Sequence, residues 1–230
     1  GWSFDEAHQR LKEYYDGYHF CRRNMTDIYN PFSLLNALSQ LRLRNYWISS
    51  GATSMLNKFV NNMELRLHDF EDCYIDKDTL ETSDVIEGGA ELFLYQTGYL
   101  TIKGYDDGVY ILGFPNFEVR KALYRVVVPA LTMKSNSEVV SAQSFLRKMM
   151  QDGNTEEAKK ALKALIADVP YSNKKMASMD MEERYRLIMS TIFRALGFRV
   201  EVERMLATGR IDMIVEVPSF IYVLEPKLSN

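Results

Sequence analysis

The spacing of apolar positions predicts that the chain begins with helices. Ser3 and Glu6 have the spacing of a capping box, and apolar residues follow at helical intervals: Phe4, Ala7, Leu11 and Tyr14. A second helix is predicted from Asn30, which can cap it, and Pro31, which suits its first position. A third stretch with helical spacing runs through Leu56, Phe59 and Met63. The first part of the chain is therefore predicted to be mostly helical.

The middle of the chain predicts a helix, a hairpin and another helix. The first of these helices has a capping pair, Asp84 and Glu87, and should end at Gly98. Asn116 caps the second helix. Between them lie two strands and a glycine-bounded turn, at 99–103, 109–112 and 104–108. The order is similar to that of a winged-helix module.

A short polar segment, 134–137, separates two apolar patterns and predicts a boundary between residues 1–136 and residues 137–230. Beyond it the pattern predicts helices at about 138–151 and 155–166. From Asp180 onward it changes to one helix that ends at Gly197 and three strands: 198–203, 211–217 and 220–228. The fold class predicted is α+β.

Composition and charge limit the function classes only loosely. Hydrophobic residues make up 47% and charged residues 26%, as in ordinary globular proteins. The net charge of -3 lacks the basic excess that is typical of nucleic-acid-binding domains. Cys21 and Cys73 have no metal-type spacing and are expected to be free thiols. With no apolar run long enough for a bilayer, a cytoplasmic protein without a membrane partner is expected.

Three charged residues in the last strands suggest phosphodiester chemistry. Asp212 lies near the start of the second strand, and Glu225 and Lys227 lie two residues apart on the third, so both point to one side of the sheet. If the strands are neighbours, the two carboxylates can share a magnesium or manganese ion. Lys227 would then orient or activate a metal-bound water. Charged residues near strand ends are more often simply solvated, so spacing alone is a weak signal.

Other charged residues allow two interpretations each. Glu183 is either a further metal ligand or a helix-capping residue, and the capping interpretation is favoured. Arg210 either contacts a phosphate or pairs with an acid. Two short basic pairs could contact phosphates, although such pairs are mostly solvated: Arg22 with Arg23, and Arg42 with Arg44.

Two segments carry a family resemblance. Residues 209–213 read Gly-Arg-Ile-Asp-Met and residues 222–228 read Tyr-Val-Leu-Glu-Pro-Lys-Leu. They resemble a bacterial branch of the PD-(D/E)XK nuclease superfamily, and 171–172 and 183–185 fit the same branch. The resemblance implies metal-dependent hydrolysis of DNA, with Asp212, Glu225 and Lys227 as catalytic residues and Mg²⁺ or Mn²⁺ as cofactor.

The earlier part of the chain resembles the C-terminal portion of an AAA-ATPase-like domain. Four segments carry this resemblance: 15–18, 29–35, 97–101 and 114–120. No Gly-x-x-x-x-Gly-Lys-Ser/Thr sequence occurs, so this chain is expected to begin after the nucleotide-binding core and to bind no ATP.

The resemblance has two departures that bear on activity. Pro226 stands where the nuclease branch usually has an aromatic residue, and proline cannot donate to a sheet ladder. The nuclease-like domain is also expected to be truncated after the third strand, which would leave an edge for self-association. Two hypotheses follow: a fragment of a metal-dependent nuclease-like protein that acts on DNA, or a non-catalytic protein- or nucleic-acid-interaction module. Whether the chain is an enzyme stays open.

Overall fold

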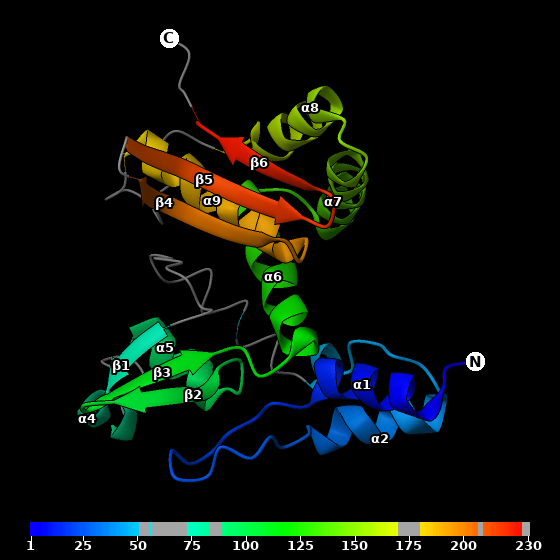
Figure 1. Cartoon of the computed structure of the whole chain (residues 1–230), viewed down its shortest axis with the longest axis vertical. Coiled ribbons are helices and arrows are strands. Elements are labelled where there is room, and N and C mark those ends of the chain that lie inside the picture. Colours follow the sequence, from blue (N-terminus) through cyan, green and yellow to red (C-terminus); the bar gives the residue numbers. More distant parts are fainter. Residues whose placement is uncertain (51–55, 57–72, 83–88, 170–179, 207–208, 227–230) are drawn as a thin grey trace. The chain divides into compact units, whose positions relative to one another are not determined.

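The computed structural model confirms the α+β class (Figure 1). It describes residues 1–50, 56, 73–82, 89–169, 180–206 and 209–226. Within these residues, eight α-helices accompany two antiparallel three-stranded sheets. The chain forms two compact units: unit 1 comprises the described residues up to Leu123, and unit 2 those from Tyr124 onward. The boundary after residue 136, drawn from the sequence pattern, stays a prediction.

The first helices of unit 1 begin where their caps predict. They are α1 (Phe4–Tyr15) and α2 (Pro31–Gln40), followed by the 3₁₀ helix η1 (Trp47–Ser50). The Glu6 amide donates to the Ser3 hydroxyl at 3.2 Å, and the Ser3 amide donates to the Glu6 carboxylate at 3.4 Å, which completes the capping box. The third helical stretch falls mainly outside the described residues, as do Asp84 and Glu87.

The sheet of unit 1 contains one strand that the sequence pattern did not predict. Its order is β1-β3-β2, and β1 (Cys73–Asp76) is the added edge strand. The other elements are α4 (Lys77–Glu81), α5 (Gly89–Gln96), β2 (Thr101–Asp106) and β3 (Val109–Gly113). The turn predicted at 104–108 was too long. The strands continue to Asp106 and Val109, because Asp107 and Gly108 both adopt positive φ and close a two-residue hairpin.

Contacts between segments 15–18, 97–101 and 114–120 contribute to the core of unit 1. Tyr15 is fully buried, and its hydroxyl donates to the Arg44 carbonyl and accepts from the Arg44 amide. The Tyr18 hydroxyl donates to the carbonyl of Gly98 at 3.0 Å. Gly17 lies against the carbonyl of Pro115, so there is no room for a side chain. These segments therefore hold together parts of the chain that are far apart in sequence.

Unit 2 contains the second half of α6 (Phe117–Thr132) and three further helices: α7 (Asn136–Gln151), α8 (Thr155–Ile166) and α9 (Met181–Ala195). The bounds predicted for α8 are confirmed. Helix α7 begins earlier than predicted, because Ser135 caps it and forms a capping box with Glu138. Asp180 caps α9, as predicted, by accepting the Glu183 amide at 2.7 Å.

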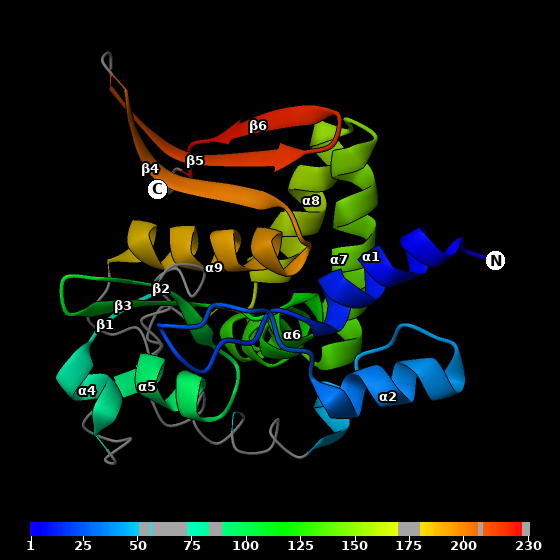
Figure 2. The ribbon, with the colours of Figure 1, turned by 60° about the horizontal axis from the view of Figure 1, so that its bottom comes forward.

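The sheet of unit 2 has the order β4-β5-β6 (Figure 1). Its strands are β4 (Arg199–Leu206), β5 (Gly209–Val217) and β6 (Phe220–Leu224), and both pairings are antiparallel. Helix α9 runs along one face of this sheet (Figure 2). The third strand was predicted to reach residue 228. It ends at Leu224 instead, because Pro226 has no backbone amide to donate to a ladder and restricts the backbone of Glu225 before it.

None of the helices in the described residues combines the length and the apolar character needed to cross a membrane. Cys21 is exposed and Cys73 is buried, and both are free thiols.

Candidate functional site

The two faces of the unit 2 sheet differ sharply in chemistry. On β5, Met213 and Val215 are fully buried and Val217 is nearly so, and these alternate positions form the face covered by α9. The intervening positions form the opposite, outer face, which carries the charged Asp212 and Glu216 with the buried Ile214 between them. On β6 the outer-face residues Ile221 and Val223 are exposed. The outer face is thus open along β6 and charged along β5.

Asp212 lies on this outer face and forms an ion pair. Its carboxylate lies 3.8 Å from the Arg210 guanidinium, and its side chain is 25% exposed. Arg210 also lies 3.4 Å from the carboxylate of Glu203, which in turn pairs with Arg186 of α9. Of the two interpretations of Arg210, the structure shows the acid pair.

The register of β5 and β6 relates Asp212 to Glu225. The last pair of the ladder is Met213 with Leu224. Continued by one step, this register would set Asp212 opposite Glu225, but Glu225 lies beyond the ladder and lines a groove together with residues of α8 and α9. Glu225 follows the end of β6 and lies outside the pairs of this ladder. Lys227 lies outside the described residues.

Glu183 does not join these two acids in a three-carboxylate group. It lies in the first turn of α9, the helix that covers the face opposite to Asp212, and its amide is capped by Asp180. Among the residues that the structure describes, no three His, Cys, Asp or Glu side chains gather closely enough to hold a metal ion. A metal on this face would therefore rest on the two strand carboxylates and on water.

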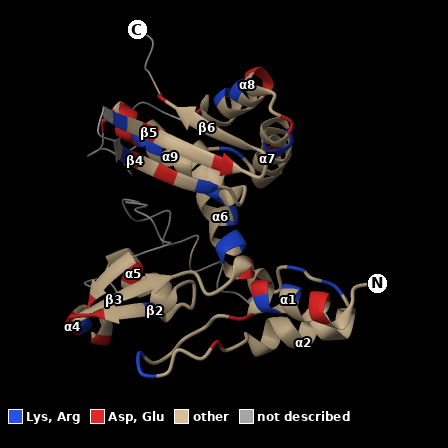
Figure 3. Ribbon diagram, viewed as in Figure 1, with Lys and Arg blue, Asp and Glu red and all other residues tan. Residues whose placement is uncertain are grey.

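Charges of both signs are interleaved along β4 and β5 (Figure 3). Arg199 pairs with Glu201 at 3.0 Å and with Glu216 at 3.7 Å, and Arg204 pairs with Glu201 at 3.1 Å. The outer face therefore carries no large field of one sign around Asp212. A phosphate that approaches Asp212 would have to compete with these carboxylates for the arginines.

A groove beside β6 was not predicted from the sequence. It has a volume of about 750 Å³ and lies between α8, α9 and β6, with Glu225 among its lining residues. Its other charged residues are Lys159, Lys163 and Glu182. The lining of α9 follows a helical stripe that begins at Glu182 rather than at Glu183, and its apolar members are Met189 and Phe193. The sequence could have revealed this stripe on α9. It could not have shown that β6 lies beside the stripe, because that depends on the fold.

The phenol of Tyr222 closes one end of this groove. Its hydroxyl donates to the carbonyl of Met150 at 2.6 Å, which ties β6 to the end of α7. Burial raises the pKa of Tyr222, so the phenol stays protonated and keeps this bond at neutral pH. The position of β6, and with it that of Glu225, is therefore supported by a hydrogen bond from the inner face.

Comparison with known proteins gives a relative but no family. No family model matches the chain, and no solved structure matches it. The chain is 25% identical, over 232 residues, to a protein of Azotobacter chroococcum mcd 1 described as an uncharacterized protein in the vnfD 5' region. The match covers 95% of this chain and 42% of that protein. The chain thus spans less than half the length of this relative.

Proposed function

We propose that the chain is part of a metal-dependent nuclease-like protein whose intact form hydrolyses DNA phosphodiesters. The observation that supports this most directly is the register of β5 and β6, whose last pair is Met213 with Leu224; the same register continued by one step would make Asp212 and Glu225 a cross-strand pair. Such pairs have Cβ atoms about 4.5–5.5 Å apart, which is close enough for two carboxylates to share one ion. Their oxygen ligands suit Mg²⁺ or Mn²⁺.

Each residue of the proposed site has a defined role. Asp212 and Glu225 would hold the ion, and Lys227 would orient or activate the attacking water. The ion, when bound, would stabilise charge on the phosphate and make its water more acidic. The succession of α9 and three antiparallel strands supports a PD-(D/E)XK-like core, and the sequence α5, hairpin, α6 supports a winged-helix-like module in unit 1.

The experiment uses metal binding as its first readout and cleavage as its second. Thermal unfolding of the full chain is measured during titration with Mn²⁺, because an ion that binds only the native state raises the melting temperature by mass action. Cleavage of double- and single-stranded DNA is then followed at saturating Mn²⁺ or Mg²⁺. We expect wild-type protein to gain stability with the metal and Asp212→Ala to lose that response together with any cleavage.

Glu216→Ala is the matched control. Glu216 lies on the same strand and face as Asp212, and it pairs with Arg199 at 3.7 Å much as Asp212 pairs with Arg210 at 3.8 Å. Removal of this second carboxylate should leave the metal response intact. Equal responses of wild type and Asp212→Ala would remove Asp212 from the site, and equal losses in both variants would reduce the effect to general electrostatics.

The second candidate function is a non-catalytic interaction module with a degenerate nuclease fold. Two observations favour it: Asp212 already pairs with Arg210, and β6 ends before Glu225 and Pro226. Under this proposal Mn²⁺ leaves the melting temperature of wild-type protein unchanged, while the chain still binds a protein or nucleic-acid partner. The metal titration therefore separates the two functions before any substrate is chosen.

A further inference from the structure

A loop in unit 1 holds two arginines beside a pocket. The loop leaves and re-enters the fold at Tyr18 and Ile28, whose amides and carbonyls form two mutual hydrogen bonds of 3.1 Å. A second bridge, between Cys21 and Asn24, tightens its tip. Arg22 and Arg23 lie between those bridge residues, and both are exposed. Of the two basic pairs found in the sequence, this pair is held by a closed loop.

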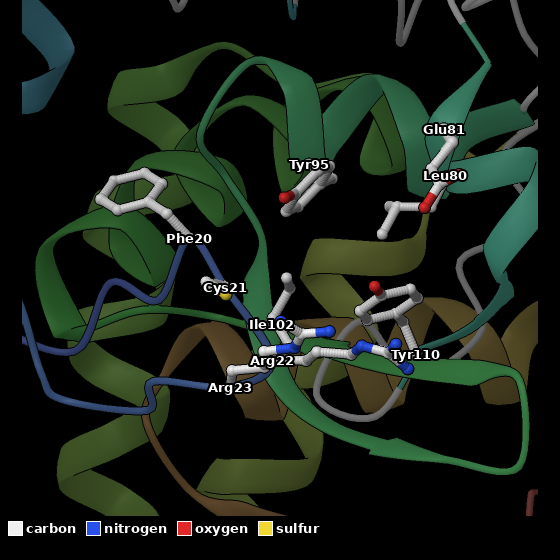
Figure 4. A pocket seen from close by; sticks show the side chains of 9 residues that line it. All are labelled: Phe20, Cys21, Arg22, Arg23, Leu80, Glu81, Tyr95, Ile102 and Tyr110. Atoms are coloured by element: carbon white, nitrogen blue, oxygen red, sulfur yellow. The ribbon is translucent and has the colours of Figure 1, made fainter.

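The pocket beside this loop has a volume of about 410 Å³ (Figure 4). Ile102 lies at its centre, and the rings of Tyr95 and Tyr110 form its walls. Burial raises the pKa of Tyr95, and the nearby phenol of Tyr110 adds to this effect. Small-molecule sites typically measure about 300–1,000 Å³, so a single nucleotide-sized group is within the range. The pocket thus combines flat aromatic walls with an arginine rim.

The charge of this rim is not neutralised by the surrounding acids. The Arg22 guanidinium lies 4.2 Å from the centre of the Tyr105 ring, which orients it without cancelling its charge. In the described part of the chain neither Arg22 nor Arg23 pairs with a carboxylate, whereas the arginines on β4 and β5 do. The one acid of the pocket lining, Glu81, lies 3.8 Å from Lys77.

We propose that this pocket binds a nucleotide unit, with its phosphate on Arg22 and Arg23 and its base against Tyr95 and Tyr110. Guanidinium groups recognise phosphate through paired hydrogen bonds, and aromatic side chains stack on any base. The nucleotide belongs either to a free mononucleotide or to a single DNA strand, which present the same chemistry. The site lies wholly in unit 1 and needs no metal, so it stands or falls independently of the proposed nuclease function.

The first test uses Cys21 as a built-in reporter. Cys21 lines the pocket and is exposed, whereas Cys73 is buried and serves as the internal reference. Alkylation of Cys21 by iodoacetamide is followed by mass spectrometry in the presence of EDTA, with added AMP, a short single-stranded DNA or inorganic phosphate. We expect AMP or the DNA to slow alkylation of Cys21. Unchanged alkylation at millimolar concentrations of all three would overturn the proposal.

The second test compares two arginine pairs of the same unit. The double variant Arg22→Ala/Arg23→Ala should bind the protecting ligand at least about ten-fold more weakly, because each hydrogen bond to a charged group contributes strongly to affinity. The control is Arg42→Ala/Arg44→Ala, which removes equal charge from exposed positions away from the pocket lining. Equal weakening in both double variants would show nonspecific electrostatics and overturn the site.

A third variant separates the base from the phosphate. Tyr95 is half-buried, and Tyr95→Leu keeps an apolar wall while it removes the ring. We expect this variant to bind AMP or the DNA several-fold more weakly, as base–aromatic stacking is worth about 1–3 kcal/mol. Inorganic phosphate should be unaffected. Unchanged nucleotide binding would overturn the assignment of a base-binding wall. Protection by the DNA without protection by AMP would identify the strand as the source of the nucleotide.

Discussion

The two units differ in where they place the residues that carry the family resemblance. In unit 1 several of these residues are buried, among them Asp16, Gly17, Tyr18 and Glu118, although Phe32 is exposed. In unit 2, Arg210, Asp212 and Glu225 retain exposed side chains. Burial of a charge requires partners, and Glu118 has them, since its carboxylate accepts the amides of Tyr46 and Trp47.

This difference teaches that a resemblance can have two physical origins. Three of the buried residues of unit 1 are explained by the fold, because Gly17, Tyr18 and Glu118 each contact a distant part of the chain. In unit 2, Arg210 also has a contact within the fold, since it pairs with Glu203, which pairs with Arg186 of α9, whereas Asp212 pairs only with Arg210 among the ion pairs of the described residues. Exposed ion pairs such as Arg210 with Asp212 contribute only about 0–1 kcal/mol to stability. A low contribution to stability does not identify a ligand, so the proposed metal site has to be tested by metal binding itself.

The largest effect is expected for Gly17→Ala in unit 1. Gly17 has a φ of +99°, and an added Cβ would lie 2.2 Å from the carbonyl oxygen of Pro115. We expect a loss of about 2–5 kcal/mol in the free energy of unfolding, from backbone strain and overpacking together. Urea unfolding followed by tryptophan fluorescence reports on this unit, since Trp2 and Trp47 both belong to it.

Gly108→Ala separates the two causes. Gly108 also has a positive φ, of +89°, but open space surrounds the position of its missing Cβ. It should therefore lose only about 1 kcal/mol, the cost of the backbone conformation alone. Similar losses at both glycines would contradict a role for Gly17 in the packing against Pro115.

Glu118→Ala is expected to have the next largest effect. It removes the acceptor of the Tyr46 and Trp47 amides, of which the latter lies 2.9 Å from the carboxylate. A loss of about 2–3 kcal/mol is expected, because the desolvated donors lose a charged partner. Glu118→Gln keeps an acceptor oxygen and should lose clearly less in the same fluorescence assay. Equal losses in the two variants would mean that the hydrogen bonds do not carry the effect.

A smaller effect should appear in the pH dependence of unit 1. Burial raises the pKa of Glu118, although Ser33 and the amides of Trp47 and Tyr46 partly oppose it. The native state therefore holds this proton to higher pH than the unfolded chain does. Its contribution to stability is complete below the unfolded-state pKa and is lost as the pH rises through the raised folded-state pKa. Glu118→Gln should flatten this part of the stability curve, and an unchanged slope would contradict the assignment.

Local signals in the sequence predicted most of the helices. The caps Ser3, Asn30 and Asp180 act through side chains a few residues away, so their spacing is visible without the fold. Strand β1 was missed because it has only four residues, Cys73–Asp76, and gains its stability from pairing with β3. The predicted end of β6, at residue 228, lies beyond the observed end at Leu224. The prediction followed the apolar residues and gave too little importance to Pro226.

The candidate site was less accessible to this reasoning. That β5, which carries Asp212, is the neighbour of β6, after which Glu225 follows, depends on tertiary packing. The groove lined by Glu182 depends on the placement of α8 and α9 beside β6. The sequences of the three elements do not predict this placement. Arg22 and Arg23 were recognised as a basic pair, but their pocket is completed by residues between Leu80 and Tyr110, far along the chain.

The smallest effect, and the one that tests the comparison most directly, is expected for Asp212→Ala in unit 2. Asp212 is partly exposed and pairs with Arg210 at 3.8 Å, so its removal should change the free energy of unfolding by less than about 0.5 kcal/mol. Met213→Ala, one residue along the same strand, removes a fully buried side chain and should cost about 2–5 kcal/mol. Hydrogen exchange of the β5 amides reports on both variants.

Comparison of the stability losses of Asp212→Ala and Met213→Ala shows whether Asp212 has a structural role. If Asp212→Ala destabilised the sheet as much as Met213→Ala, the aspartate would be a structural residue like Glu118, and its presence would no longer argue for a metal. A near-neutral effect on stability would show that Asp212 is not a structural residue, which fits both the proposed metal site and a solvated side chain, and the Mn²⁺ response of the variant distinguishes these two. The loss of the Mn²⁺ response in the same variant would then follow from chemistry rather than from unfolding.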